Sequence, residues 1–176
     1  MRHYIKTDTT KKVLSLDRLL ILIQSWRDND ETVVFTNGVF DLLHRGHLAV
    51  LEKSAAHGDR LIVGVNSDIS ARRLGKGTGR PLVSEIQRAE MMAGLEAVDA
   101  VVLFDEDTPF ELLSSLKPDV LVKGADYKLE DIIGAEFVKR VERVDLVAGF
   151  STSSLIAKIQ QLKPTPKDSD VKNSDV

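Results

Sequence analysis

Two histidines three residues apart, His44 and His47, lie in the stretch TNGVFDLLHRGH at residues 36–47. At the start of a helix that follows a strand, both imidazoles would point into one crevice. Gly46 between them would let a ligand's phosphates approach the backbone, and the N–H groups of a helix N-terminus favour anions. Phosphoryl transfer needs such donors and little covalent chemistry. The stretch therefore predicts phosphate contacts, with zinc ligation and a purely structural role as the alternatives.

Residues 69–84 form a second candidate segment, with four basic residues and no acidic one. Glycines alternate with basic and polar residues there, which is typical of a mobile loop that folds over anions. The guanidinium of Arg80 matches the geometry of phosphate oxygens, whereas Arg72 and Arg73 could simply form a surface at a helix end. A solvated basic loop without a ligand is the alternative interpretation.

Two further segments follow expected strands and so belong to the same edge of the sheet. KGADY at residues 123–127 comes directly after one strand. STS at residues 151–153 opens the last expected helix, where hydroxyl and N–H groups can hold a phosphate. An ordinary N-cap is the alternative role for these hydroxyls.

The elements that must position these residues alternate between strand and helix. Such alternation predicts parallel pairing with right-handed crossovers, and hence an α/β, three-layer, Rossmann-like fold with a parallel five-stranded sheet and ligands at the carboxyl ends of its strands. An N-terminal extension with an amphipathic helix (1–32), one catalytic domain (33–162) and a disordered tail (163–176) are expected. The expected strands are 33–35, 61–65, 101–104, 120–122 and 146–147, and the expected helices are 15–27, 47–57, 84–93, 108–117 and 153–162.

Composition excludes several classes of protein. The 176 residues carry a net charge of −3 and no cysteine. The first observation argues against a nucleic-acid or anionic-membrane surface. The second excludes a disulfide scaffold, a cysteine-based zinc finger and a cysteine nucleophile. No spanning segment or signal peptide is visible, so a cytoplasmic protein is expected.

Six blocks in order resemble the HxGH nucleotidyltransferases, the superfamily that includes the cytidylyltransferases. The closer resemblance is to the heptose 1-phosphate adenylyltransferases (ADP-heptose synthases), whose activity is often the C-terminal half of a protein fused to a sugar kinase. Val39 and the segments at 95–99 and 146–149 depart from relatives, and the last two differences favour the adenylyl branch over the cytidylyl branch. The blocks are FTNGVFDLLHRGH (35–47), GVNSD (64–68), RRLGKGTGRP (72–81), FDEDTP (104–109), KPDVLVKGADY (117–127) and GFSTSSLIAKI (149–159).

The resemblance implies an enzyme that joins ATP and a heptose 1-phosphate to give ADP-heptose and pyrophosphate by direct in-line attack, for lipopolysaccharide inner-core precursors. It implies Mg²⁺ bound mainly through the ATP phosphates, with no protein metal ligand. A cytidylyltransferase acting on glycerol 3-phosphate or another polyol phosphate is the alternative enzyme. A nucleotide-sensing or scaffold protein without turnover is the alternative from another class, and a homo-oligomer remains open.

The resemblance also assigns roles residue by residue. His44, His47 and Lys76 would be catalytic. In the sugar phosphate, Asp41 would reach the sugar hydroxyls and Lys76 would hold the phosphate. The nucleotide would be bound by Thr36, Asn37, Gly38, Phe40, His44, His47, Arg80, Lys123, Gly124, Asp126, Ser151, Thr152 and Ser153.

Overall fold

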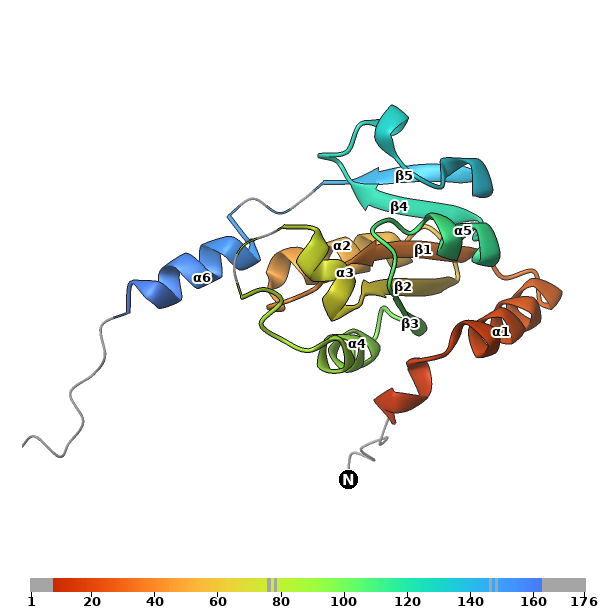
Figure 1. The fold of residues 1–176 in the computed structure, drawn as a ribbon. Coiled ribbons are helices and arrows are strands. Elements are labelled where there is room, and N and C mark those ends of the chain that lie inside the picture. Colours follow the sequence, from red (N-terminus) through yellow and green to blue (C-terminus); the bar gives the residue numbers. More distant parts are fainter. Residues whose placement is uncertain (1–7, 76, 78, 146, 148, 163–176) are drawn as a thin grey trace, which may run out of the picture.

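A single parallel sheet forms the centre of the computed structural model, which describes residues 8–162 except 76, 78, 146 and 148. Its strand order is β3-β2-β1-β4-β5 (Figure 1), and every pairing is parallel. The predicted five-stranded α/β sheet is therefore confirmed. The strands are β1 (Val33–Gly38), β2 (Arg60–Asn66), β3 (Ala100–Phe104), β4 (Val120–Gly124) and β5 (Arg140–Val144).

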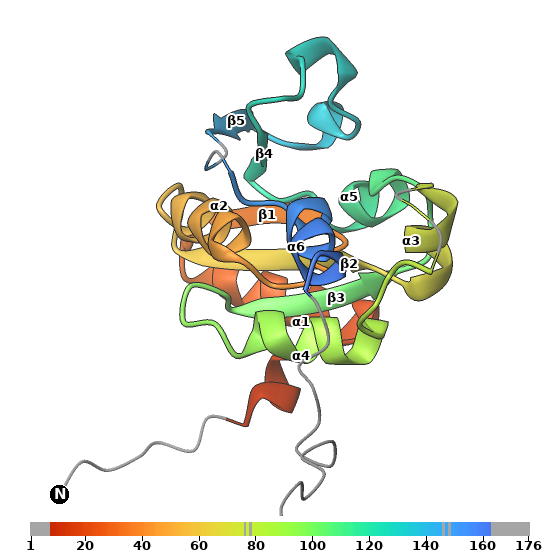
Figure 2. The same cartoon turned by 90° about the vertical axis from the view of Figure 1, so that its left-hand side faces the viewer.

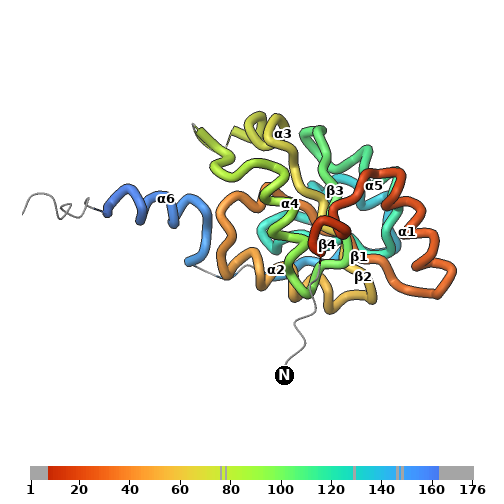
Figure 3. The backbone as a smooth tube through the Cα atoms, turned by 90° about the horizontal axis from the view of Figure 1, so that it is seen from below, coloured from red at the N-terminus to blue at the C-terminus, as the bar shows by residue number. Residues whose placement is uncertain are grey.

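Helices cover both faces of the sheet, which gives the three predicted layers (Figure 2). One core cluster joins α1 and α5 to one face of the sheet, and a second joins α2 and α4 to the other. In Figures 1 and 3, α6 extends away from this body. The helices are α1 (Leu16–Asp28), α2 (Arg45–Ala55), α3 (Asp68–Arg73), α4 (Glu85–Ala93), α5 (Phe110–Leu116) and α6 (Thr152–Gln160), with 3₁₀ turns at Thr9–Lys12, Leu129–Asp131 and Ala135–Phe137.

The segment before β1 is packed into the body. Leu19, Ile23 and Trp26 recur at helical spacing on α1 and are buried in the core on one face of the sheet. The chain just before α1 also runs along β3, where the amide of Leu14 donates to the carbonyl of Val101 at 2.9 Å. The described part of residues 1–32 thus covers one face and one edge of the sheet. The predicted tail at 163–176 lies outside the described residues.

The prediction of the fifth strand at 146–147 is wrong. The strand is Arg140–Val144, Val147 belongs to no element, and residue 146 lies outside the described ones. This strand contains two valines among the charged residues Arg140, Glu142 and Arg143. Charged residues are tolerated there since β5 is an edge strand with much of its surface in water. Such a mixed pattern carries a weak apolar signal, whereas the aliphatic pair at 146–147 resembles a strand.

The strand order reverses direction between β1 and β4. β1, β2 and β3 follow one another toward one edge of the sheet, whereas β4 and β5 lie on the other side of β1. Ligands of open parallel sheets bind outside the carboxyl ends of the strands at such a switch point. Separately, none of the helices in the described ranges is long and apolar enough to cross a bilayer.

Candidate functional site

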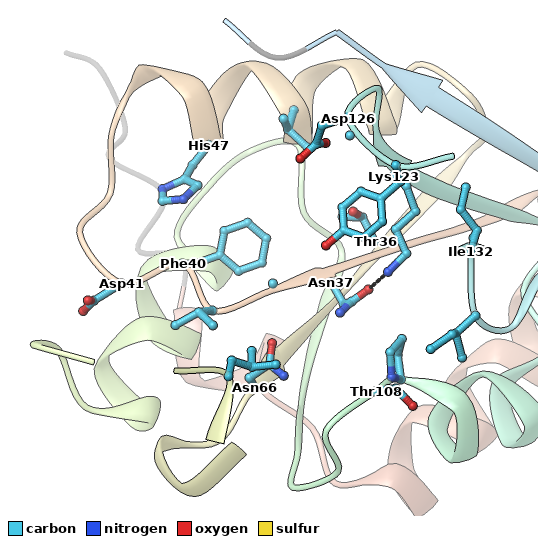
Figure 4. A pocket seen from close by; sticks show the side chains of 18 of the residues that line it. Thr36, Asn37, Phe40, Asp41, His47, Asn66, Thr108, Lys123, Asp126 and Ile132 are labelled. Carbon is cyan, nitrogen blue, oxygen red and sulfur yellow. Dashed lines mark hydrogen bonds between the residues drawn. The ribbon is translucent and has the colours of Figure 1, made fainter. Parts of the chain in front are cut away.

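A cavity of about 350 Å³ opens at this switch point (Figure 4). It is bounded by the ends of β1, β2 and β4 and by the segments that follow β1, β3 and β4. The structure thus brings together most of the residues predicted from sequence at one place. Those that line the cavity are Thr36, Asn37, Gly38, Phe40, Asp41, His47, Arg80, Lys123, Gly124, Asp126 and Thr152.

The two histidines form one stacked unit at the start of α2. His44 is the N-cap, and its Nδ1 accepts a hydrogen bond from the backbone N–H of His47 at 3.3 Å. The rings stack with centroids 3.7 Å apart. Burial lowers the pKa of His44, which favours the neutral ring that the cap requires. Because Nδ1 is the acceptor, the proton of neutral His44 lies on Nε2, which can donate to a ligand.

Gly46 is required by the close approach of the His44 ring. A Cβ at this position would lie 2.9 Å from Nδ1 of His44 and 3.3 Å from Cβ of Phe150. The second distance also shows that the segment leading into α6 passes directly beside the start of α2. Two helix N-termini therefore converge near the His pair, and both offer unpaired N–H groups to an anion.

Phe40 supports the His pair from the side of the cavity. Its φ of +50° is uncommon for a residue with a side chain, and its ring meets the ring of His47 edge to face at 5.3 Å. Gly38 accommodates this ring, since a Cβ there would lie 3.2 Å from it. The turn after β1 thus buries an aromatic ring that fixes where His47 points.

The Asp41 side chain is 1% exposed and is engaged within the protein. It accepts hydrogen bonds from the amides of Leu82 and Val83, at 2.7 and 3.0 Å, and pairs with Arg80 Nε at 3.1 Å. These contacts tie the end of the basic segment to the turn after β1. Asp41, expected to reach sugar hydroxyls, lies where it positions Arg80 at the cavity wall.

A buried arginine that the sequence analysis did not single out reinforces this connection. Arg88 on α4 is 0% exposed. It donates to the carbonyls of Val39 at 2.6 Å and Val83 at 2.9 Å, and pairs with Asp68 at 2.8 Å. One guanidinium therefore joins the turn after β1, the start of α3 and the end of the basic segment. Its position inside an amphipathic helix gave no signal of this role.

Asn37 and Lys123 face each other across the switch point. Lys123 Nζ donates to Oδ1 of Asn37 and lies 5.7 Å from the centre of the Tyr127 ring (Figure 4). Burial lowers the pKa of Lys123 to about 8. The neighbouring hydroxyl of Thr36 donates to the carbonyl of Val122 at 3.1 Å, so it bridges β1 and β4.

Four predicted site residues differ from the rest in placement. His44 does not line the cavity but stacks on His47, which does. Ser151 and Ser153 are exposed, and Ser151 caps α6 by accepting from the amide of Ser154 at 3.0 Å. Lys76 lies outside the described residues. The alternative role stated for these serines, an N-cap, is thus realised for Ser151.

The cavity also contains residues that the sequence analysis did not name as ligand contacts. Asn66 is the last residue of β2, so its side-chain amide lies at the carboxyl end of that strand. This position after an expected strand could have identified Asn66 as a site residue from the sequence. The helix expected over 108–117 begins only at Phe110, so Thr108 precedes it and lies at the cavity wall. The further lining residues include Asp107, Tyr127, Asp131, Ile132 and Ile133.

The chain is similar to known proteins in both sequence and structure. Residues 35–176, most of the chain, match the family described as cytidylyltransferase-like. The chain belongs to the cytidylyltransferase-like family. The resemblance inferred from the six sequence blocks is thereby confirmed for the family.

Curated relatives of this cytidylyltransferase-like chain carry the name "bifunctional protein HldE". The protein from Campylobacter jejuni is 52% identical over 163 residues, which is 93% of this chain and 34% of the relative. The one from Helicobacter pylori is 50% identical over 157 residues, 89% of this chain and 33% of the relative. The chain therefore spans about a third of the length of these relatives.

Solved structures agree on the fold. The lipopolysaccharide core biosynthesis protein from Thermoplasma volcanium matches with a TM-score of 0.55 and 31% identity, over 66% of this chain and 97% of that one. A pantoate-beta-alanine ligase from Francisella tularensis matches with a TM-score of 0.53 over 76% of this chain and 66% of that one. At 14% identity the second match concerns the fold alone.

Proposed function

We propose that the chain is an adenylyltransferase that joins ATP and a heptose 1-phosphate to give ADP-heptose and pyrophosphate. The observation that carries the proposal is the convergence of the α2 and α6 N-termini and the stacked pair of His44 and His47 on a cavity at the switch point. Such donors suit the phosphates of a nucleoside triphosphate.

In this proposal the polyphosphate of ATP lies against the helix N-termini. His47 and Thr152 line the cavity, and His44, which stacks on His47, would donate from Nε2 to a phosphate at the margin of the cavity. Charge accumulates on the leaving pyrophosphate during transfer, and donors fixed in advance stabilise that charge without reorganising. Gly38 and Phe40 would contribute backbone contacts, and Arg80, held by Asp41, would contact phosphate oxygens.

The attacking group is an oxygen of the sugar phosphate. It is already anionic, so the protein needs no general base and contributes positioning and charge stabilisation. The bond between this oxygen and the α-phosphorus forms as the bond to pyrophosphate breaks. Lys76, which lies outside the described residues, would bind the phosphate of the incoming sugar 1-phosphate.

In this proposal the magnesium ion arrives with ATP and is bound mainly through its phosphates. Within the described residues no three His, Asp or Glu side chains group closely enough to hold a metal, and Asp41 is occupied by Arg80 and two amides. Mg²⁺ binds mainly to phosphates and waters in such sites. It would neutralise part of the triphosphate charge.

The heptose assignment rests on the sequence blocks together with the relatives. The HldE proteins are called bifunctional and are about three times as long as this chain. This agrees with an adenylyltransferase that is often fused to a sugar kinase. The Thermoplasma volcanium match is titled a lipopolysaccharide core biosynthesis protein, which supports a precursor of the lipopolysaccharide inner core as the product. The cytoplasm, where ATP is available, is the proposed location.

The test is pyrophosphate release by the purified protein with ATP or CTP and a panel of sugar and polyol phosphates. The expected result is release with ATP and heptose 1-phosphate. Preference for CTP with glycerol 3-phosphate would instead establish a polyol-phosphate cytidylyltransferase. The family description "cytidylyltransferase-like" is the reason to include CTP in the panel. Binding of ATP without release with any acceptor would indicate a nucleotide-binding protein without turnover.

A further inference from the structure

We propose that Lys123 and Asn37 bind the phosphate of the incoming sugar 1-phosphate, rather than the phosphates of ATP. The inference rests on the proposed function and assigns the acceptor's place within the same cavity. It reassigns two residues that the sequence resemblance attributes to the nucleotide.

The geometry of in-line transfer restricts where the acceptor can bind. The nucleophile must approach the α-phosphorus on the side opposite to the leaving pyrophosphate. The helix N-termini and the His pair lie at one side of the cavity, and these are the groups suited to pyrophosphate. In Figure 4, His47 and Lys123 lie at opposite sides of the cavity with Phe40 between them. The acceptor phosphate therefore belongs beside Lys123.

The charged residues that line the cavity are unevenly suited to a phosphate. Besides Lys123, the lining residues of the described chain include one other lysine or arginine, Arg80, which pairs with Asp41. The remaining charged lining residues are the exposed Asp107, Asp126 and Asp131. A phosphate dianion is repelled by these carboxylates, whereas sugar hydroxyls can donate to them. Among the described lining residues, Lys123 is therefore the cation placed to receive the acceptor's phosphate. Lys76, which the resemblance assigns to the same phosphate, would act alongside it.

The Lys123 ammonium has only neutral partners among the described residues. No carboxylate of the described residues lies within ion-pair distance of its Nζ, whose partners are the amide of Asn37 and the face of Tyr127. A half-buried ammonium with only neutral partners is costly, and its lowered pKa reflects this cost. An arriving phosphate would supply the missing charge and raise that pKa again.

The walls around this position suit a sugar. Asn66 and Thr108 offer an amide and a hydroxyl, and Ile132 and Ile133 add an apolar surface. Polar groups that fix orientation within a mostly apolar wall are typical of small-molecule sites. The sugar would extend from Lys123 toward these residues and the exposed aspartates.

The decisive experiment compares the steady-state kinetics of the wild-type protein with those of Lys123→Met, with each substrate varied in turn. Loss of a charged hydrogen bond to phosphate is expected to raise KM for heptose 1-phosphate about 10- to 100-fold, while KM for ATP changes by about twofold or less. Lys123→Arg should recover part of the affinity because it keeps the charge. Lys139→Met is the matched control, because that side chain is 83% exposed and pairs with Asp119. Asp119 directly precedes β4, at the end of that strand opposite to the cavity.

Calorimetry gives a second readout that does not depend on turnover. Heptose 1-phosphate is titrated at pH 8.5 into protein saturated with an ATP analogue that cannot be cleaved at the α-phosphate. With a pKa of about 8, about three-quarters of the Lys123 side chains are neutral at this pH. Binding of the sugar phosphate should therefore take up a large fraction of one proton, and Lys123→Met should abolish this uptake.

The outcomes separate this inference from the proposed function. A raised KM for ATP alone, or proton uptake on binding the analogue instead of the sugar phosphate, would return Lys123 to the nucleotide and overturn the inference while the adenylyltransferase stands. The inference would also be overturned if Lys123→Met had the kinetic constants of the wild type and took up protons as the wild type does. A wild-type protein that releases no pyrophosphate with any sugar phosphate would overturn the proposed function. Proton uptake on binding heptose 1-phosphate, lost in Lys123→Met, would then still support the acceptor site.

Discussion

At the scale of single residues, the site depends on side chains that fix one another. His44 is both helix cap and stacking partner, and its capped Nδ1 leaves Nε2 as the donor. Phe40 and Gly38 fit together beneath His47. Each of these residues acts through a neighbour only a few positions away in the chain, because the turn after β1 leads directly into α2.

The first prediction concerns the histidine pair. His44→Ala and His47→Ala should each lower kcat about 10²- to 10³-fold, because each removes a donor for the charge on the leaving group. The thermal unfolding curve, followed by circular dichroism, should show a folded protein in both cases. His57→Ala, in the turn that follows α2, serves as the control and should retain the wild-type kcat. Near-native rates in both test variants would contradict the assignment of the site.

Gly46 gives a sharper test of geometry. Gly46→Ala adds one methyl group 2.9 Å from Nδ1 of His44, and a helix interior otherwise favours alanine over glycine. We expect kcat to fall by at least about tenfold, because a displacement of about 1 Å can cost as much as 100-fold. Activity assays combined with thermal unfolding check this, and an active, more stable variant would show that the His44 ring has room to move.

The pH dependence follows from Lys123. Its pKa is about 8 in the free protein, and a bound dianion raises it. Binding therefore favours the protonated form, so KM for heptose 1-phosphate should be constant below about pH 8. Above this pH it should rise about tenfold per unit until the pKa of the complex is reached. The measurement is KM between pH 6.5 and 10. Lys123→Met should show no such rise, and a wild-type KM that falls above pH 8 would have the wrong sign.

At the scale of elements, buried ionic contacts hold three segments together. Asp41 fixes residues 80–83 to the turn after β1, and Arg88 fixes the same segment to that turn and to α3. Both side chains are almost completely buried, so their bonds are poorly replaced by water. The turn that holds the His pair and the end of the basic segment are thereby placed at a constant separation.

Arg88 should consequently matter for both stability and activity. Arg88→Met leaves two carbonyls and Asp68 without their partner, and should lower the free energy of unfolding by about 2–3 kcal/mol, since Asp68 keeps some contact with water. Arg45→Met removes an exposed pair with Glu52 and should cost less than about 1 kcal/mol. Urea unfolding measures both values. Equal losses would show that the buried network contributes no more than a surface pair.

If Arg88→Met fails to fold, Arg88→Lys tests the positioning role. It keeps the charge but cannot make all three contacts. KM for ATP should rise in this variant, because Arg80 is positioned through the same segment. A change confined to stability, with native KM and kcat, would limit Arg88 to folding.

At the scale of the whole molecule, α1 is part of the sheet's cover. It packs on the same face as α5, and the chain leading into it lies along β3. The order of the strands then places the ends of β1 and β4 next to each other at the switch point. The site is therefore assembled from segments as far apart in sequence as Asn37 and Lys123.

A pair of isoleucines on α1 tests this packing. Ile23→Ala should lower the free energy of unfolding by about 2–5 kcal/mol, because its side chain is fully buried in the core. Ile21→Ala changes the same residue type on the same helix, but that side chain is 73% exposed, so its effect should stay within about 0.5 kcal/mol. Similar losses in chemical unfolding would mean that α1 is not held against the sheet.

The sequence alone determined the local and periodic features. Alternating strands and helices established the parallel, three-layer sheet, and Gly46 between two histidines indicated a phosphate site at a helix start. These follow from interactions between residues close together in the chain. The edge strand β5 was not predicted at its true position. Its charged residues are in contact with water, so the sequence there lacks the run of apolar residues by which a strand is identified.

Only the tertiary structure decided how distant residues combine. It directed Asp41 to Arg80 and two amides, buried Arg88 among three segments, and set Lys123 beside Asn37 with no carboxylate from the described part of the chain in ion-pair distance. Nothing in the local sequence distinguishes a carboxylate that binds sugar from one that binds a neighbouring loop. That choice depends on which partners the strand order and the packing of the helices bring within hydrogen-bond distance, because burial makes an unpaired polar group costly.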